Sequence, residues 1–146
     1  MADEPGKWGA TFAYDKNVSV ESEGFFQSKN ESYPWIQIFL NPKSPLSVSG
    51  IHLYNRVDSH GDRLRNIEVR AGMNVVPLGF SGSQIQENSV CGHFAGPGED
   101  GGEIIVKCDS PIMANSITIQ KLETGILHIN EIKVNPSNEI LEIINI

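Results

Sequence analysis

The chain has 146 residues, a net charge of −7 and a pI near 5.0. A chain of this length fits one domain and can bury a sizeable core. The acidic balance argues against nucleic acid and anionic membrane surfaces as partners, because both would repel the chain at long range. No apolar run approaches the length of a membrane span. The segment Met1–Lys7 is polar, so we expect either a cytosolic chain or one whose secretion signal has been removed.

Apolar residues recur at every second position, which is the period of a β-strand with one buried face. In Asn66–Ala71, for example, Ile67 and Val69 are expected to point inward and Glu68 and Arg70 outward. No segment shows a sustained helical stripe. Short strands separated by Gly, Pro, Asn and Ser predict an all-β sandwich or barrel. The predicted strands are Trp35–Leu40, Gly50–Tyr54, Asn66–Ala71, Glu103–Cys108, Asn115–Gln120 and Ile126–Val134.

The segment Ala71–Gly102 is rich in glycine and proline and is predicted to be mostly loop. The domain is expected to span residues 1–135, followed by a tail over 136–146. The apolar residues of that tail fit either an additional edge strand or a frayed chain end, and the sequence does not separate the two.

The chain has two cysteines, Cys91 and Cys108, with strand-like sequence between them. They fit either a disulfide that closes a hairpin or two buried free thiols. The glycosylation sequons at Asn17 and Asn30 favour a secreted protein, although such triplets also arise by chance.

The densest polar cluster of the sequence directly follows a predicted strand, where a rigid sandwich usually carries its binding residues. It comprises Arg56, Asp58, His60, Asp62, Arg63 and Arg65. Arginines whose charge is offset by neighbouring carboxylates suit a neutral polar ligand such as a sugar, because guanidinium groups donate several hydrogen bonds. The alternative is a solvated turn with structural ion pairs. Asp58 and Asp62 resemble a glycosidase pair only superficially, because neighbouring arginines lower carboxyl pKa values and disfavour a general acid.

The cluster resembles the signature of the F-type lectins, the fucose-binding branch of the discoidin-like coagulation-factor C domains. In that signature a histidine is followed by Arg-x-Asp-x4-Arg/Lys, and Arg56, Asp58 and Arg63 match its second part. The segments Gly9–Asn17 and Ile129–Val134 also resemble the family's entry segment and closing strand. The resemblance implies a jelly-roll-like antiparallel β-sandwich of the galactose-binding-domain-like type. It also implies a Cys91–Cys108 disulfide and non-catalytic binding of a fucose- or galactose-type sugar with an axial hydroxyl.

Two departures from the family pattern bear on the ligand. The segment Gln27–Tyr33 contains no histidine where the family carries one, and Ser59-His60 replaces the adjacent cysteines of many members. We therefore hypothesise that His60 takes over the role of the missing histidine at the sugar site. Tyr33 or Phe94 is expected to stack on an apolar sugar face.

The resemblance also implies a structural calcium ion between the entry loop and the last strand, held by carboxylate and carbonyl oxygens. The implied ligands are Phe12, Asp15, Asn17, Ser28, Asn130 and Glu131. The alternative is that Asp15 and Glu131 cap turns or pair with Lys16 and Lys133.

Glycans or glycoproteins are the expected partners of a secreted protein of this kind, without membrane insertion. Oligomers or tandem copies are expected, because single sugar sites bind weakly. One alternative is a protein- or lipid-interaction domain of the same fold, with Met73, Val75, Val76 and Phe80 as exposed apolar spikes. A second is a carbohydrate-binding module of a larger enzyme.

Overall fold

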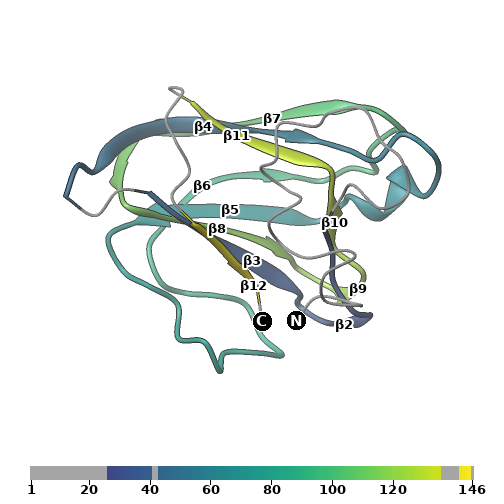
Figure 1. Ribbon diagram of the computed structural model, residues 1–146, viewed down its shortest axis with the longest axis horizontal. Coiled ribbons are helices and arrows are strands. Elements are labelled where there is room, and N and C mark those ends of the chain that lie inside the picture. Colours follow the sequence, from purple (N-terminus) through teal and green to yellow (C-terminus); the bar gives the residue numbers. More distant parts are fainter. Residues whose placement is uncertain (1–25, 41–42, 136–141, 146) are drawn as a thin grey trace.

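Strands with alternating apolar residues build two antiparallel sheets in the computed structural model, which describes residues 26–40, 43–135 and 142–145. In Figure 1 the three-stranded sheet lies above the five-stranded sheet. The order of the larger sheet is β12 (Glu142–Asn145), β3 (Trp35–Phe39), β8 (Ser116–Lys121), β5 (Ile67–Gly72) and β6 (Ser89–Phe94). The smaller sheet consists of β11 (Glu131–Asn135), β4 (Leu46–Tyr54) and β7 (Glu103–Ala114). These sheets confirm the predicted all-β sandwich.

Two short ladders and one helical turn complete the described part of the chain. The ladders pair β1 (Phe26–Gln27) with β10 (His128–Ile129) and β2 (Glu31–Ser32) with β9 (Thr124–Gly125). A single 3-10 turn, η2 (Gly61–Arg63), lies between β4 and β5. No helix of the described segments has the length and apolar character that crossing a membrane requires.

The core lies between the two sheets and consists mainly of branched aliphatic side chains. Ile117 and Ile119 of β8 belong to the same cluster as Ile51 and Leu53 of β4, and all four side chains are fully buried. Residues at alternate positions share one face of a strand, so the period-two pattern of the sequence determines which side chains enter the core.

The outer face of the larger sheet is covered by the loop between β5 and β6, residues 73–88, which Figure 1 shows below the sheet at its left end. Gln37 of β3 anchors this loop, because it exchanges two hydrogen bonds with the backbone of Val76. Trp35 donates its indole N–H to the carbonyl of Phe80. Val76 and Phe80 therefore pack against Trp35 in a small second cluster, so Val76 is buried and is not an exposed spike.

The same loop explains why Glu68 is buried, although the alternation of β5 predicts that its side chain points outward. Glu68 points away from the core but is only 3% exposed, because the 73–88 loop lies over it. Its carboxylate accepts hydrogen bonds from Arg70, from Gln84 of the loop and from His93 of β6. Burial alone would raise the pKa of Glu68, but these donors hold it below its usual value.

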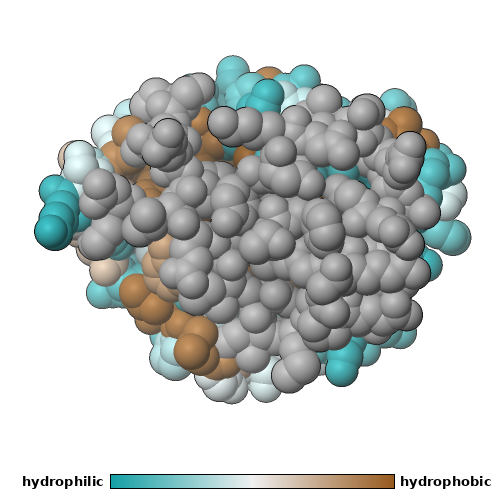
Figure 2. Space-filling model, viewed as in Figure 1, coloured by the Kyte–Doolittle hydropathy of each residue, from teal (hydrophilic) through white to brown (hydrophobic). Residues whose placement is uncertain are grey.

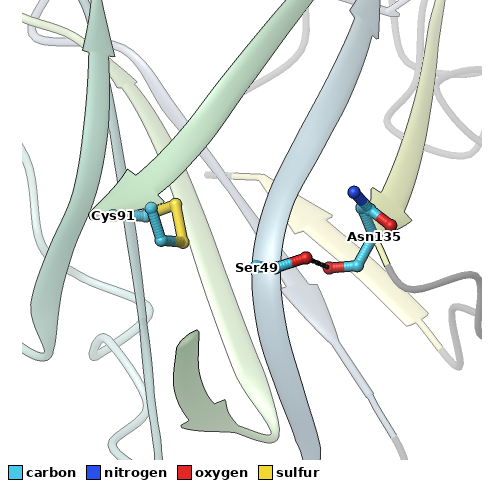
Figure 3. Close-up of a disulfide and its surroundings, with 4 residues drawn as sticks. Ser49, Cys91 and Asn135 are labelled. Carbon is cyan, nitrogen blue, oxygen red and sulfur yellow. Dashed lines mark hydrogen bonds between the residues drawn. A yellow bond between two sulfur atoms is a disulfide. The ribbon is translucent and has the colours of Figure 1, made fainter. Parts of the chain in front are cut away.

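The disulfide between Cys91 of β6 and Cys108 of β7 joins the two sheets along the edge where these strands meet. Figure 3 shows the bond between the two strands. The same view shows Ser49 of β4, which donates its hydroxyl to the backbone carbonyl of Asn135 at 3.0 Å. The pairing confirms the disulfide and excludes the alternative of two free thiols.

The structure corrects several strand boundaries. The segment that was expected to be loop contains β6, and the predicted strand Ile126–Val134 divides at Asn130 into β10 and β11. In the tail, β12 pairs with β3 as an antiparallel edge strand, which favours the first of the two expectations for that segment.

Candidate functional site

The arginine-rich segment that follows β4 forms a loop at one end of the sandwich, shown at the right of Figure 1 beside the 3-10 turn. Asn55 holds this loop closed by donating its side-chain amide to the carbonyls of Gly61 at 2.7 Å and Glu99 at 3.0 Å. The backbone N–H of Gly61 donates to Asp100 at 2.7 Å. A Cβ atom at Gly61 would lie 2.5 Å from the Asp100 carboxylate, so only glycine fits there. The loop is thus fixed before any ligand arrives.

Arg56 is held in one orientation by Asp58. Its Nε and Nη2 atoms donate to the two carboxylate oxygens at 2.7 Å each, in a bidentate pair. The Arg56 side chain is 9% exposed, whereas that of Asp58 is 35% exposed. The hydrogen bond from Arg56 lowers the pKa of Asp58 to about 2. Asp58 therefore stays ionised at neutral pH and is unsuited to act as a general acid.

A pocket of about 360 Å³ opens beside this loop, where the ends of β8 and β5 meet. Arg63 and its neighbour Asp62 line it from the 3-10 turn. Arg65 lines it as well and forms an exposed ion pair with Glu123, at 3.1 Å from Nε to Oε1. The complete lining is Asn30, Asp62, Arg63, Arg65, Lys121, Glu123, Thr124, Gly125 and Ile126.

Of the residues predicted to bind sugar, Arg63 lines this pocket, while Arg56, Asp58 and His60 are not among its lining residues. His60 is exposed on the loop, with a left-handed backbone at φ 60°, directly before the 3-10 turn. Neither of the aromatic candidates, Tyr33 and Phe94, lines the pocket. The predicted loop therefore supplies one wall, and the opposite wall comes from a different part of the chain.

That opposite wall was missed by the sequence reasoning. It is formed by residues 121–126 at the end of β8, with Asn30 from the turn between β1 and β2. The sequence shows only that Lys121 and Glu123 lie at the end of a clear apolar strand. Their position beside the loop that leads into β5 comes from the pairing of Lys121 with Ile67, which the structure reveals.

Lys121 forms the most deeply buried part of the pocket wall and is 3% exposed. Its ammonium group donates to the backbone carbonyls of Arg63 and Ile126. Burial lowers the pKa of Lys121; the nearby carboxylate of Glu123 opposes this shift, whereas the cations of Arg65 and Arg63 add to it. A Cβ atom at Gly125 would lie 3.1 Å from Cε of Lys121, so the glycine leaves room for the lysine side chain.

His128 of β10 is fully buried beside the same loop. Burial lowers its pKa to about 3, and the cations of Arg56 and Arg63 contribute to the shift. The imidazole is therefore neutral at physiological pH and lies near both arginines of the predicted signature. Its strand partner is Gln27 of β1.

The implied calcium ligands fall partly outside the described residues, since Phe12, Asp15 and Asn17 lie in the segment 1–25. Asn130 and Glu131 are adjacent and buried at the start of β11. The Ser28 hydroxyl donates to the carbonyl of Lys29 and accepts from the backbone of Leu127. Within the described segments, no group of three or more His, Cys, Asp or Glu side chains gathers as a metal site. Calcium binding stays a prediction.

Comparison with solved structures identifies the fold. A fucolectin from the serum of striped bass, Morone saxatilis, matches with a TM-score of 0.75 and 22% identity over 92% of this chain. The chain therefore has the same fold as this fucolectin. It spans 44% of the striped bass protein. No protein-family model matches the sequence, and neither does any curated protein.

Carbohydrate-binding modules share this galactose-binding-domain-like fold with the chain. A fucose-binding module from Streptococcus pneumoniae matches with a TM-score of 0.67 and 20% identity, over 92% of this chain and 85% of that one. The family 32 carbohydrate-binding module of Clostridium perfringens NanJ, in complex with galactose, matches with a TM-score of 0.66 and 22% identity. That match covers 92% of this chain and 88% of the module.

Proposed function

We propose that this domain binds carbohydrate without catalysis, and that the pocket beside the 3-10 turn receives a sugar of the fucose or galactose type. The observation that carries the proposal is the polar pocket lined by Arg63 at the end of a rigid sandwich. Structurally similar proteins are a fucolectin, a fucose-binding module and a module complexed with galactose, which supports the same ligand class.

In this proposal Arg63 donates to ligand hydroxyls from the wall of the pocket. Arg56, which does not line the pocket, donates to the part of the ligand that lies over the adjoining loop, with Asp58 as its positioning residue. The bidentate contact with Asp58 fixes the plane of the Arg56 guanidinium, so binding costs little side-chain entropy there. Arg63 lines the pocket itself. His60 remains our candidate for a contact at the rim of the site, in place of the histidine that the family pattern carries.

A glycan array tests this proposal, with wild type compared with Arg63→Ala and Arg56→Ala. Both variants should lose binding to fucose- and galactose-terminated glycans while they keep the circular dichroism spectrum of the wild type. Lys107→Gln is the control, because Lys107 is exposed on β7 and does not line the pocket. Binding retained in Arg63→Ala would overturn the assignment of the site.

A calcium ion at Glu131 is a second part of the proposal. Glu131 is 1% exposed on β11, and a buried carboxylate requires strong partners such as a cation or several donors. Together with Asn130, Ser28 and the entry-segment residues Phe12, Asp15 and Asn17, it would hold the ion in a structural role. Thermal unfolding should then occur at higher temperature in calcium than in a chelator, and Glu131→Gln should abolish that difference. An equal midpoint in both buffers would refute the ion.

The disulfide between Cys91 and Cys108 supports an extracellular location, because such bonds persist in oxidising compartments. We therefore propose a secreted protein that engages glycans through several copies, either as an oligomer or as tandem domains.

The alternative of a protein- or lipid-interaction domain rests on the other end of the molecule. Met73, Val75 and Leu78 are 48%, 54% and 59% exposed in the loop between β5 and β6. Figure 2 shows an apolar surface at lower left, where this loop lies in Figure 1. This alternative would be favoured if the wild type bound to liposomes and a Val75→Ser, Leu78→Ser double variant did not.

A further inference from the structure

The charges that line the pocket differ in sign from those of the molecule as a whole. Arg63, Arg65 and Lys121 face two carboxylates, Asp62 and Glu123, within a chain whose net charge is −7. Neutral hydroxyls accept hydrogen bonds from such cations, but a ligand carboxylate gains more from a surplus of positive charge. The surplus therefore bears on which sugar the pocket selects.

The surplus belongs to Arg63, because the other two cations are already satisfied. Arg65 donates to both oxygens of Glu123 at 3.1 and 3.3 Å, and Asn66 donates to the same carboxylate at 2.7 Å. Lys121 donates to two backbone carbonyls. For the Arg63 guanidinium, by contrast, the structure shows no ion pair or hydrogen bond with any described residue. Asp62, its chain neighbour, is exposed and forms no ion pair with it among those residues.

Lys121 adds to the positive charge at the wall of this pocket. Although its ammonium group donates to two backbone carbonyls, burial and the cations of Arg65 and Arg63 disfavour its charged form, whereas the carboxylate of Glu123 favours it. A ligand carboxylate within a few ångströms would offset that cost, since opposite charges interact strongly in a poorly solvated site. The protein thus keeps a buried cation at the wall of an open pocket, where a bound anion would stabilise it.

We propose that the preferred ligand is an acidic sugar of the galactose configuration, a galacturonic-acid-type residue whose carboxylate contacts Arg63. This inference rests on the proposed function and narrows its substrate class. The planar guanidinium fork matches the two oxygens of a carboxylate, and such charge-assisted bonds are about twice as strong as neutral ones. The sugar keeps the axial hydroxyl expected of the ligand and carries its charge on the adjacent exocyclic carbon.

The test is calorimetric titration of the wild-type protein with four methyl glycosides: galacturonide, the methyl ester of galacturonide, galactoside and fucoside. We expect the galacturonide to bind at least about tenfold more tightly than its ester and than the galactoside. The ester is the matched control, because it keeps the shape of the ligand and removes its charge. The preference should shrink as salt concentration rises.

Substitutions test which charged side chain causes the preference for the galacturonide over its ester. Arg63→Gln should abolish the preference for the galacturonide over its ester, and Arg63→Lys should retain part of it, because the charge remains while the fork is lost. Lys107→Gln makes the same change in net charge outside the pocket and should leave the preference intact.

The outcomes separate this inference from the proposed function. If the galactoside or fucoside binds as tightly as the galacturonide, the preference for an acidic sugar is overturned while carbohydrate binding stands. If none of the glycosides binds and the glycan array is also blank, both are overturned. If Arg63→Gln still preferred the galacturonide over its ester, the proposed contact between Arg63 and the sugar carboxylate would be wrong.

Discussion

Replacing His128 with glutamine should make the stability of the domain less sensitive to mild acid. The imidazole is fully buried, and its pKa falls from 6.5 in the free side chain to about 3 in the folded protein. Between these two values the unfolded chain binds a proton that the folded protein does not. Protonation therefore favours the unfolded chain, and stability decreases as pH falls below about 6.5.

The loss of stability in mild acid can be calculated from the difference between the pKa values of His128 in the unfolded and folded protein. Each pH unit below the unfolded pKa costs about 1.4 kcal/mol, so a fall to about pH 5 removes roughly 2 kcal/mol of stability through His128 alone. Carboxylates with lowered pKa, such as Asp58 and Glu68, do not contribute in this window, because they are ionised in both states. Their stabilisation is lost only at lower pH, as each takes up a proton in the folded protein.

Urea unfolding at about pH 7.5 and about pH 5 measures the difference, with the disulfide intact. Wild type should lose about 2 kcal/mol more than His128→Gln over this interval. Proton NMR of the wild type provides a check that does not depend on the variant: one histidine signal should stay unshifted across the same range. Equal pH dependence in both proteins, or four histidines that all titrate near pH 6.5, would refute the burial of a neutral His128.

Three further predictions concern stability. Replacing Cys91 and Cys108 with alanine removes the link between the sheets and should lower the free energy of unfolding by about 3 kcal/mol, whereas an unchanged urea midpoint would contradict the role of the bond. Ile119→Ala leaves a cavity between the sheets and should cost about 2–5 kcal/mol in thermal or urea unfolding; a loss below about 1 kcal/mol would place this side chain outside the core. In Gly50→Ala the new Cβ would lie 2.6 Å from the carbonyl oxygen of Val106, so amide hydrogen exchange in β7 should accelerate, and native-like protection there would argue against the close approach of β4 and β7.

The strands were predictable because their side chains alternate between the core and the outer face. Ile67 and Val69 point inward as the period-two pattern requires. Glu68 also points outward as predicted, but the pattern did not predict its burial, which depends on the 73–88 loop folding over the outer face. That contact is non-local and is made by Gln84, a residue that no periodicity connects with β5. The local sequence pattern determines the face of the strand on which a side chain lies, but a loop from a distant part of the chain determines whether that side chain is exposed to solvent.

Only the part of the candidate site that lies in one continuous stretch of sequence was predictable. Arg63 belongs to a compact polar motif that one stretch of sequence contains, and the structure places it at a pocket. Lys121 and Glu123 reach the same pocket only because β8 pairs with β5, and strand pairing is not visible in a single sequence. The charge surplus that points to an acidic ligand is therefore a property of the assembled pocket, not of the motif.

The proposed sugar site is the pocket between the 3-10 turn and residues 121–126. Backbone amide NMR during titration with methyl galactoside and methyl galacturonide can locate the bound sugar. We expect shift changes to concentrate at Arg56 and at residues 62–65 and 121–125, at one end of the sandwich. Changes centred on the apolar loop 73–88, or no changes at saturating sugar, would contradict the proposed site.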